Sequence, residues 1–133
     1  MKYMLDTNIC IYLIKKHPVK TLHRLQQTDA SDVCISAISV SELEYGIEKS
    51  QKRDLNRLAL AEFLAPIEIF PFDEAAASHY GRIRAFLESK GRTIGPYDLQ
   101  IAAHAFSRNL TLVTNNVREF KRVPQLSVEN WAK

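Results

Sequence analysis

The sequence contains no long apolar run and few cysteines. No stretch approaches the roughly eighteen uncharged apolar residues that a bilayer-spanning helix needs. The chain reaches Asp6 too early to contain the apolar region of a signal peptide. The only cysteines, Cys10 and Cys34, lie in apolar stretches, so we expect buried thiols rather than a disulfide or a metal pair. We therefore expect a cytoplasmic protein that does not associate with a membrane.

The motifs of several common enzyme classes are also absent. There is no Walker lysine motif, no G-x-S-x-G and no G-x-G-x-x-G, so ATP, acyl-transfer and dinucleotide chemistry lack their usual support. The histidines show no metal-ligand spacing with one another or with the cysteines, which argues against zinc. No internal repeat or linker-like stretch is visible, and 133 residues suit one domain, which we expect to cover residues 1–133.

The net charge of +3 is too small to indicate a nucleic-acid-binding protein by itself. The distribution of the charge is more informative, because basic residues are concentrated in two segments, at positions 82–92 and 108–122. Basic clusters of this kind most often form only a solvated face. Their meaning depends on the residues that lie beside them.

Short apolar runs alternate with helical patterns along the chain. We expect strands at Tyr3–Leu5, Val33–Ile35, Ile67–Phe70 and Thr111–Val113, and a short fifth strand at Leu126–Val128. Helical patterns separate these strands, and the strands are continuously apolar, which is typical of a parallel sheet covered on both faces. The sequence therefore predicts an α/β, Rossmann-like three-layer fold with a parallel four- to five-stranded sheet flanked by helices.

Acidic residues follow the ends of the predicted strands. Asp6 follows the first strand, Glu42 lies on the helix after the second, and Asp98 lies in the first turn of a later helix. Asn116 and Glu119 follow the fourth strand. Ligands of such sheets bind beyond the carboxyl ends of the strands, so these side chains are expected to converge. Converging carboxylates repel one another unless a cation neutralises them, and oxygen ligands suit Mg²⁺ or Mn²⁺, which support phosphodiester hydrolysis.

Each acid also has a structural explanation. Glu42 follows Ser39 by three positions and Glu119 follows Asn116 by three, which is the spacing of a helix-capping box. Asp98 in a first helical turn is favoured by the helix dipole whatever its function. Asp6 is harder to explain in this way, because acids seldom end a buried central strand. Capping and metal binding can coexist, so the metal hypothesis depends on the whole set.

Four blocks of the chain together resemble a known family. They are Met4–Asn8, Ser36–Gly46, Ile94–Ala105 and Leu112–Phe120, in order and with matching spacing. The blocks are similar to those of PIN-domain ribonucleases, and most closely to the VapC toxins of bacterial toxin–antitoxin pairs. The resemblance runs from Tyr3 to Trp131. It implies RNA cleavage with Mg²⁺, which Mn²⁺ can replace. It also implies a homodimer and a VapB-type antitoxin, through which alone the protein would contact DNA.

The resemblance assigns roles by position. Asp6 and Asp98 would be the principal metal ligands, Glu42 would complete the set, and Glu119 would be the fourth catalytic acid. Supporting hydrogen bonds would come from Asn8, Thr114 and Asn116. Many PIN domains have Asp where this chain has Asn116, which leaves one-metal and two-metal catalysis both open.

The resemblance also bears on the substrate and on the basic segments. It implies a tRNA substrate, and we expect the anticodon loop of initiator tRNA to be cut by in-line attack of water. In this setting the basic residues beside the acids would bind RNA phosphates: Arg82, Arg92, Arg118 and Lys121. No histidine pair suits a mechanism through the 2′-hydroxyl, and we expect His104 to be packed or at the surface.

Helices near Ile38–Gly46 and Leu55–Leu64 offer apolar surface for an antitoxin helix, although the same surface could belong to the core or to a dimer contact.

Two other functions compete with a ribonuclease. The alternative function is a catalytically silent PIN-like module that binds RNA, against which the complete set of acids argues. A phosphoaspartyl enzyme using Asp6 would need a second Asp where this chain has Asn8.

Overall fold

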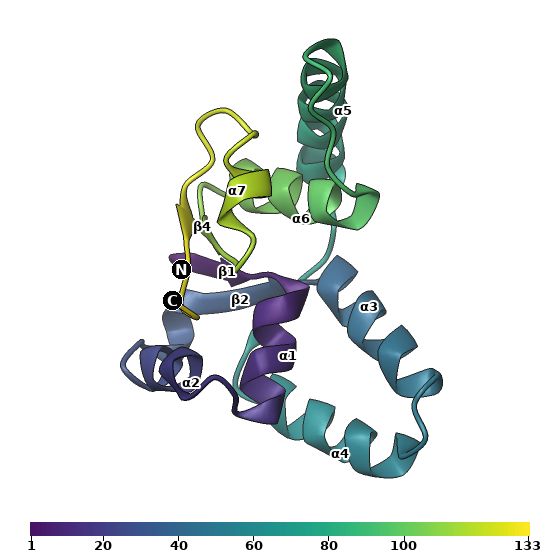
Figure 1. Ribbon diagram of the computed structural model, residues 1–133, viewed down its shortest axis with the longest axis vertical. Helices are drawn as coiled ribbons and strands as arrows, with labels where there is room; N and C mark the ends of the chain where they lie inside the picture. Colours follow the sequence, from purple (N-terminus) through teal and green to yellow (C-terminus); the bar gives the residue numbers. More distant parts are fainter.

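A parallel five-stranded sheet runs through the centre of the protein (Figure 1). The computed structural model describes all 133 residues. The strand order is β3-β2-β1-β4-β5, with every neighbouring pair parallel. The strands are β1 (Tyr3–Leu5), β2 (Val33–Ser36), β3 (Glu68–Phe70), β4 (Thr111–Val113) and β5 (Val128–Glu129). β1 is therefore the central strand, and its carboxyl end lies in the middle of one sheet edge. The predicted α/β fold with a parallel sheet is confirmed.

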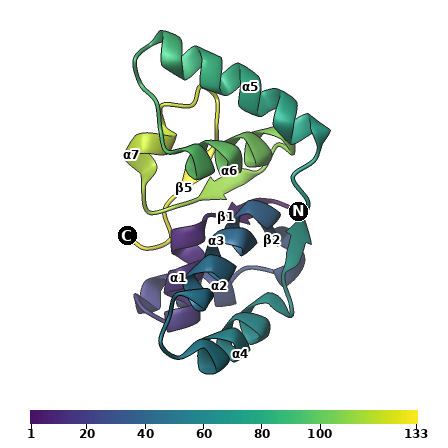
Figure 2. The same cartoon turned by 90° about the vertical axis from the view of Figure 1, so that its right-hand side faces the viewer.

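Seven α-helices and one short 3₁₀-helix connect the strands. They are α1 (Thr7–Lys15), α2 (Val19–Gln26), η1 (Ala30–Asp32), α3 (Ala37–Glu48), α4 (Arg53–Leu64), α5 (Glu74–Ser89), α6 (Pro96–Ser107) and α7 (Val117–Phe120). Figures 1 and 2 show α5, α6 and α7 on one side of the sheet and α1, α2 and α4 on the other. None of these helices has both the length and the apolar content needed to cross a membrane.

Alternation along the strands divides the core into two apolar clusters. Successive side chains of a strand point to opposite faces of the sheet. Met4 and Leu112 accordingly belong to the cluster under α5 and α6, whereas Leu5 and Val113 belong to the cluster under α1, α3 and α4. Because both faces of β1, β2 and β4 are covered, these strands are apolar at nearly every position.

Most helix boundaries follow the sequence signals, with two exceptions at the caps. Asp73 caps α5, since its carboxylate accepts a hydrogen bond from the Ala76 amide at 3.0 Å. The expected capping box of Ser39 and Glu42 is wrong, because α3 begins earlier, at Ala37. Its cap is Ser36, whose hydroxyl accepts from the Ile38 amide at 3.1 Å. Asn116 precedes α7 but caps no amide with its side chain.

Candidate active site

Asp6 lies at the carboxyl end of the central strand and is also the N-cap of α1. Its Oδ1 accepts a hydrogen bond from the Ile9 amide at 2.9 Å, and the residue is 3% exposed. Burial, with a smaller contribution from the charges of Asp98 and Glu42, raises the pKa of Asp6 from 3.8 to about 6. Hydrogen bonds from the Thr114 hydroxyl and the Ile9 amide act in the opposite direction. Asp6 therefore has a structural role that the sequence did not reveal, the capping of α1. Only Oδ1 accepts the bond from the Ile9 amide, and the second carboxylate oxygen does not take part in the cap.

Glu42 is held beside Asp6 by the residue that follows Asp6 in the chain. The Thr7 hydroxyl donates a 2.6 Å hydrogen bond to Oε1 of Glu42 and lies 3.2 Å from the hydroxyl of Ser39. Glu42 is partly exposed, and Ser39 is fully buried one turn before it on α3. The contact between Thr7 and Glu42 fixes the start of α1 against α3, so two of the predicted acids approach the same edge of the sheet.

Asp98 reaches the same region from the first turn of α6. Gly95 is the N-cap of this helix and Pro96 its first residue, a position at which proline costs no hydrogen bond. The side chain of Asp98 is partly buried. Burial raises the pKa of Asp98, and the negative charges of Glu42 and Glu119 raise it further. The electrostatic coupling shows that these carboxylates lie near one another without a neutralising partner.

Glu119 completes the acidic edge from α7. The Asn116 side-chain amide donates a 2.7 Å hydrogen bond to Oε2 of Glu119, and the Asn116 backbone amide donates to the Thr114 hydroxyl at 2.9 Å. Thr114 is fully buried and also interacts with Asp6. Asn116 and Thr114 therefore connect Glu119 to Asp6. Asn8 differs from them, because its side chain is exposed and makes no hydrogen bond within the protein.

The donor chemistry of this edge fits a divalent cation. None of the protein's ion pairs involves Asp6, Glu42, Asp98 or Glu119, so the edge carries uncompensated negative charge. All the candidate donors are oxygen atoms, the preference of Mg²⁺ and Mn²⁺. No three of the carboxylates have converged on one point at ligand distances, because Thr7 holds Glu42 and Asn116 holds Glu119. The acids thus surround a common region without forming a closed cage.

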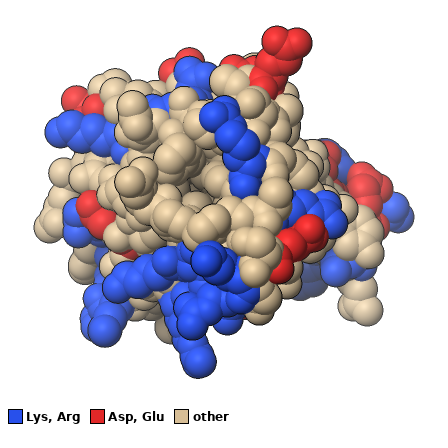
Figure 3. Space-filling view, turned by 90° about the horizontal axis from the view of Figure 1, so that it is seen from above, with Lys and Arg blue, Asp and Glu red and all other residues tan.

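A basic pocket lies between the loop before α6 and α7. This cavity of about 410 Å³ is lined by no apolar or acidic residue, only by Gly91, Arg92, Thr93, Arg118, Lys121 and Arg122. The Arg122 guanidinium donates to the Thr93 carbonyl at 2.9 Å, and none of the four cations forms a salt bridge. Figure 3 shows Lys and Arg side chains gathered in one continuous group on this side of the molecule.

Three of the four residues predicted to bind RNA line this basic pocket. Arg92, Arg118 and Lys121 come together there, whereas Arg82 lies on α5 and donates to the Ser78 hydroxyl at 3.0 Å. Arg122 lies in one of the basic segments of the sequence, but its place in the pocket was not predicted. The contact of Thr7 with Glu42 was not predicted either, and the only indication of it in the sequence is that Thr7 directly follows Asp6.

Comparisons with known proteins identify the family and match the fold. The PIN domain family model matches residues 3–126. The Ribonuclease VapC2 of Rickettsia felis is 48% identical over 134 residues, covering 100% of both chains. The tRNA(fMet)-specific endonuclease VapC of Shigella flexneri is 46% identical over 132 residues, covering 99% of both chains. The chain therefore belongs to the PIN domain family and, within it, to the VapC ribonucleases.

A solved structure supports the same assignment. The crystal structure of VapBC2 from Rickettsia felis, bound to a DNA fragment from their promoter, contains a chain with a TM-score of 0.92 to this protein. That chain is 47% identical, and the match covers 98% of this chain and 99% of the other. The resemblance stated from the sequence is thus confirmed in both family and fold.

Proposed function

We propose that this protein is the toxin of a type II toxin–antitoxin pair, a Mg²⁺-dependent endoribonuclease that acts in the cytoplasm as one PIN domain over residues 1–133. The observation that carries the proposal is the edge of four carboxylates without a counter-charge, in a chain whose relatives are named ribonucleases. The substrate that we propose is tRNA, with the anticodon loop of initiator tRNA as the target. A relative named as a tRNA(fMet)-specific endonuclease supports that choice.

The proposed roles of the acids follow from their positions. Asp6 and Asp98 are the groups whose pKa values are raised, so they gain most from a bound cation. Glu42 and Glu119 can turn toward the same ion once they leave Thr7 and Asn116. A divalent cation would lower the pKa of the attacking water and would offset negative charge at the phosphate, with Mn²⁺ able to substitute for Mg²⁺. Asn8, Thr114 and Asn116 would orient the acids and the water.

RNA would be held by the basic pocket beside Glu119. Arg118 is on the same short helix as Glu119, and Lys121 is the residue that caps the end of this helix, so phosphates bound there lie next to the acidic edge. The pocket offers cations and no base-reading geometry, which provides affinity rather than sequence choice. Arg82 would contribute only to phosphates that reach the outer surface of α5.

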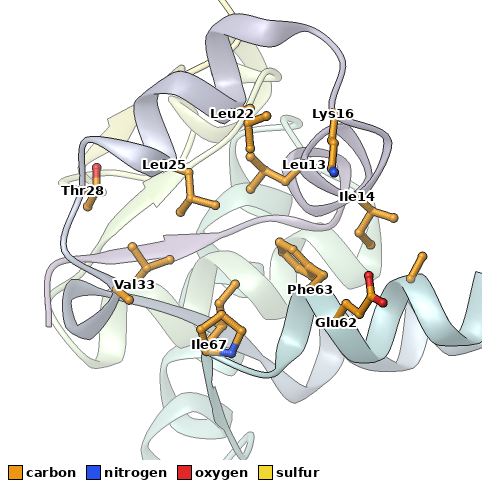
Figure 4. A pocket seen from close by; sticks show the side chains of 13 residues that line it. Leu13, Ile14, Lys16, Leu22, Leu25, Thr28, Val33, Glu62, Phe63 and Ile67 are labelled. Carbon is orange, nitrogen blue, oxygen red and sulfur yellow. The ribbon is translucent and has the colours of Figure 1, made fainter.

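A VapB-type antitoxin would bind an apolar groove on the opposite side of the protein. The groove, of about 410 Å³, lies between α1, α2 and α4, and Figure 4 shows Leu13, Leu22, Leu25 and Phe63 facing into it. An amphipathic helix can place apolar side chains in such a groove. Of the two large apolar residues at the end of α4, Phe63 lines the groove and Leu64 does not. DNA would be contacted only through the antitoxin.

We also propose a homodimer. Large apolar side chains on α3 and α4 remain exposed outside the groove, among them Tyr45 (67%), Leu55 (62%) and Leu58 (58%). Such side chains would be covered by a second copy of the chain. Light scattering should then give a mass of twice 15.2 kDa; a monomer at micromolar concentration would contradict this part of the proposal.

The decisive experiment is cleavage of total tRNA by the purified protein in Mg²⁺ or Mn²⁺. We expect discrete fragments that disappear with EDTA and with Asp6→Asn, and whose mapped ends identify the target. Asp73→Asn is the matched control, because it removes a helix-capping carboxylate outside the acidic edge and should leave cleavage unchanged. Bound but uncut RNA, with metal present and the protein folded, would favour the catalytically silent RNA-binding module instead.

A further inference from the structure

His104 is the one fully buried histidine of the chain, and the roles described so far do not use it. It lies on α6, with Nδ1 2.7 Å from the hydroxyl oxygen of Ser36. Its Nε2 has no hydrogen-bond partner, and the ring packs edge-on against Phe72 with an interplanar angle of 80°. Buried polar atoms are nearly always paired, so a histidine retained at this position needs a reason.

Ser36 contacts both α3 and α6. Its oxygen accepts from the Ile38 amide as the cap of α3. The hydroxyl can donate to Nδ1 of a neutral His104 ring or accept from it in the other tautomer, and either arrangement joins the two helices. Burial and the charge of Arg108 lower the pKa of His104, and Asp73 acts in the opposite direction. The neutral ring is thus the form present near pH 7.

This bond is the only side-chain hydrogen bond that joins α6 to another part of the chain. The remaining buried side chains of α6 are apolar, and three of them are alanines. Apolar packing against α5 and the sheet holds α6 in its layer, but such packing is non-directional. The bond to Ser36 is directional, and it ties α6 to the point where β2 ends and α3 begins.

The two helices joined in this way carry two of the four acids. Asp98 is in the first turn of α6, and Glu42 is on α3, the helix that Ser36 caps. We infer that His104 is a positioning residue of the acidic edge: through Ser36 it fixes α6 against α3 and sets the separation between Asp98 and Glu42. The inference rests on the proposed function in one respect, that a divalent cation binds between these acids.

The test measures Mn²⁺ affinity by calorimetry, together with kcat and KM for tRNA cleavage. His104→Leu fills the same space without an acceptor and should weaken Mn²⁺ binding about tenfold, the usual effect of losing a group that orients a ligand. It should lower kcat while leaving KM for RNA near the wild-type value. His104→Asn retains an acceptor near Nδ1 and should restore most of the loss. Ser36→Ala should also weaken Mn²⁺ binding, and it should lower the melting temperature more than His104→Leu because it removes the cap of α3 as well. The double variant should bind Mn²⁺ no more weakly than Ser36→Ala.

The control is Ile101→Val, a change in a fully buried side chain of the same helix that leaves the hydrogen bond intact. It should lower the melting temperature without changing Mn²⁺ affinity. If His104→Leu lowers the melting temperature but binds Mn²⁺ and turns over as the wild type does, His104 is only structural and the inference is wrong. Should His104→Leu not fold, Ser36→Ala decides the question, with Asp73→Ala as the control for the loss of a helix cap. If Asp6→Asn binds Mn²⁺ as tightly as the wild type, the proposed function fails, and the inference with it.

Discussion

Asp6 combines two demands on one side chain. As the cap of α1 it must accept a backbone hydrogen bond, and at the centre of the acidic edge it must carry a charge in a buried place. The first demand is met by Oδ1 and the Ile9 amide, while the second is met only when a cation is nearby. The metal-free protein is therefore strained electrostatically at this residue.

Because its pKa is raised on folding, Asp6 should stabilise the protein less as the pH rises, the opposite of a carboxylate whose pKa is lowered. Its pKa is raised from 3.8 to about 6 on folding, so the folded protein binds a proton more tightly than the unfolded chain between these values. Stability from this group is complete below pH 4 and is lost as the pH rises to 6. Without metal, Asp6→Asn should be more stable than the wild type at pH 7, by up to about 3 kcal/mol, and equal to it near pH 4. Urea titrations at the two pH values measure this difference.

Asp73 is the control of opposite sign. It is also a helix-capping carboxylate, but it is exposed, and the Ala76 amide lowers its pKa. The Asp73 carboxylate stabilises the fold at pH values above the pKa that this group has in the unfolded chain. The contribution is lost as the pH falls through the lower pKa of the group in the folded protein. Asp73→Asn should therefore destabilise the protein at pH 7 and have little effect at pH 3. If Asp6→Asn destabilised the protein at pH 7 as much as Asp73→Asn does, our account of the acidic edge would be contradicted.

Asn116 is the residue at which this chain departs from many PIN domains. Its amide donates to Glu119, where an aspartate would instead add a fifth negative charge. Asn116→Asp should tighten Mn²⁺ binding, by about tenfold, because affinity rises with the number of charged ligands. Calorimetry measures the change, and Asn116→Ala controls for the lost hydrogen bond. Weaker binding by the aspartate variant would show that Asn116 is needed to hold Glu119.

At this scale the sequence identified the acids but not their partners. Asp6, Glu42 and Glu119 are predictable because each comes after a strand end, and strand ends meet in a parallel sheet. Asp98 follows α5 instead, and its prediction depended on its place in the first turn of a helix. The bond from Thr7 to Glu42 spans 35 positions and the bond from His104 to Ser36 spans 68. Such pairs depend on helix rotation and strand register, which residue spacing does not determine.

At the scale of the elements, the helix caps and the last strand are the places where the structure differs from what the local sequence predicts. Arg53–Leu64 forms the predicted helix, because leucine and alanine dominate it and Pro66 follows it. The fifth strand was expected at Leu126–Val128 and lies at Val128–Glu129. Pairing with β4 sets this register, Leu112 with Val128 and Val113 with Glu129. Tertiary pairing thus decides a short strand whose own sequence is ambiguous.

Helix α7 is the element whose function can be tested through salt. It presents Arg118 and Lys121 to the basic pocket and Glu119 to the acids. In an Asp6→Asn background, which binds RNA without cutting it, Arg118→Ala should weaken RNA binding. The slope of log affinity against log salt should become shallower by about 0.7, the value for one phosphate contact on a single strand. An unchanged slope would remove Arg118 from the RNA contact.

The control for the salt experiment is Arg53→Ala on α4. Arg53 is exposed and lies near Glu48, on an element that lines neither the basic pocket nor the acidic edge. Its loss should leave the salt slope as it is. A slope that became equally shallow in both variants would mean that net charge, rather than the pocket, attracts RNA.

Across the whole molecule the two proposed binding surfaces lie on different layers. The apolar groove is built from α1, α2 and α4, and the basic pocket from the loop before α6 and from α7 (Figures 1 and 2). The sequence predicted the parallel sheet, but strand order follows from how the layers pack, and that order places these surfaces apart. A change in the groove should therefore leave the RNA-binding surface intact.

Phe63→Ala tests this separation. Phe63 lines the groove and is partly buried there, so its loss should weaken binding of the VapB-type antitoxin, by about 2–3 kcal/mol if the side chain anchors the partner helix. The rate of tRNA cleavage by the free protein should not change. Leu64→Ala, the neighbouring apolar change outside the groove lining, is the control. Equal affinity of Phe63→Ala and wild type for the antitoxin would move the partner to another surface.

The single tryptophan connects the end of the chain to this groove. Trp131 is 3% exposed, packs edge-on against Tyr3 with ring centroids 5.2 Å apart, and lies under the Arg24 guanidinium at 5.3 Å. Arg24 belongs to α2, the helix that also supplies Leu22 and Leu25 to the groove. Any displacement of α2 by a docking partner therefore alters the charge directly above the indole. The protein thus contains its own fluorophore for partner binding, and its emission can follow that event in real time without a label.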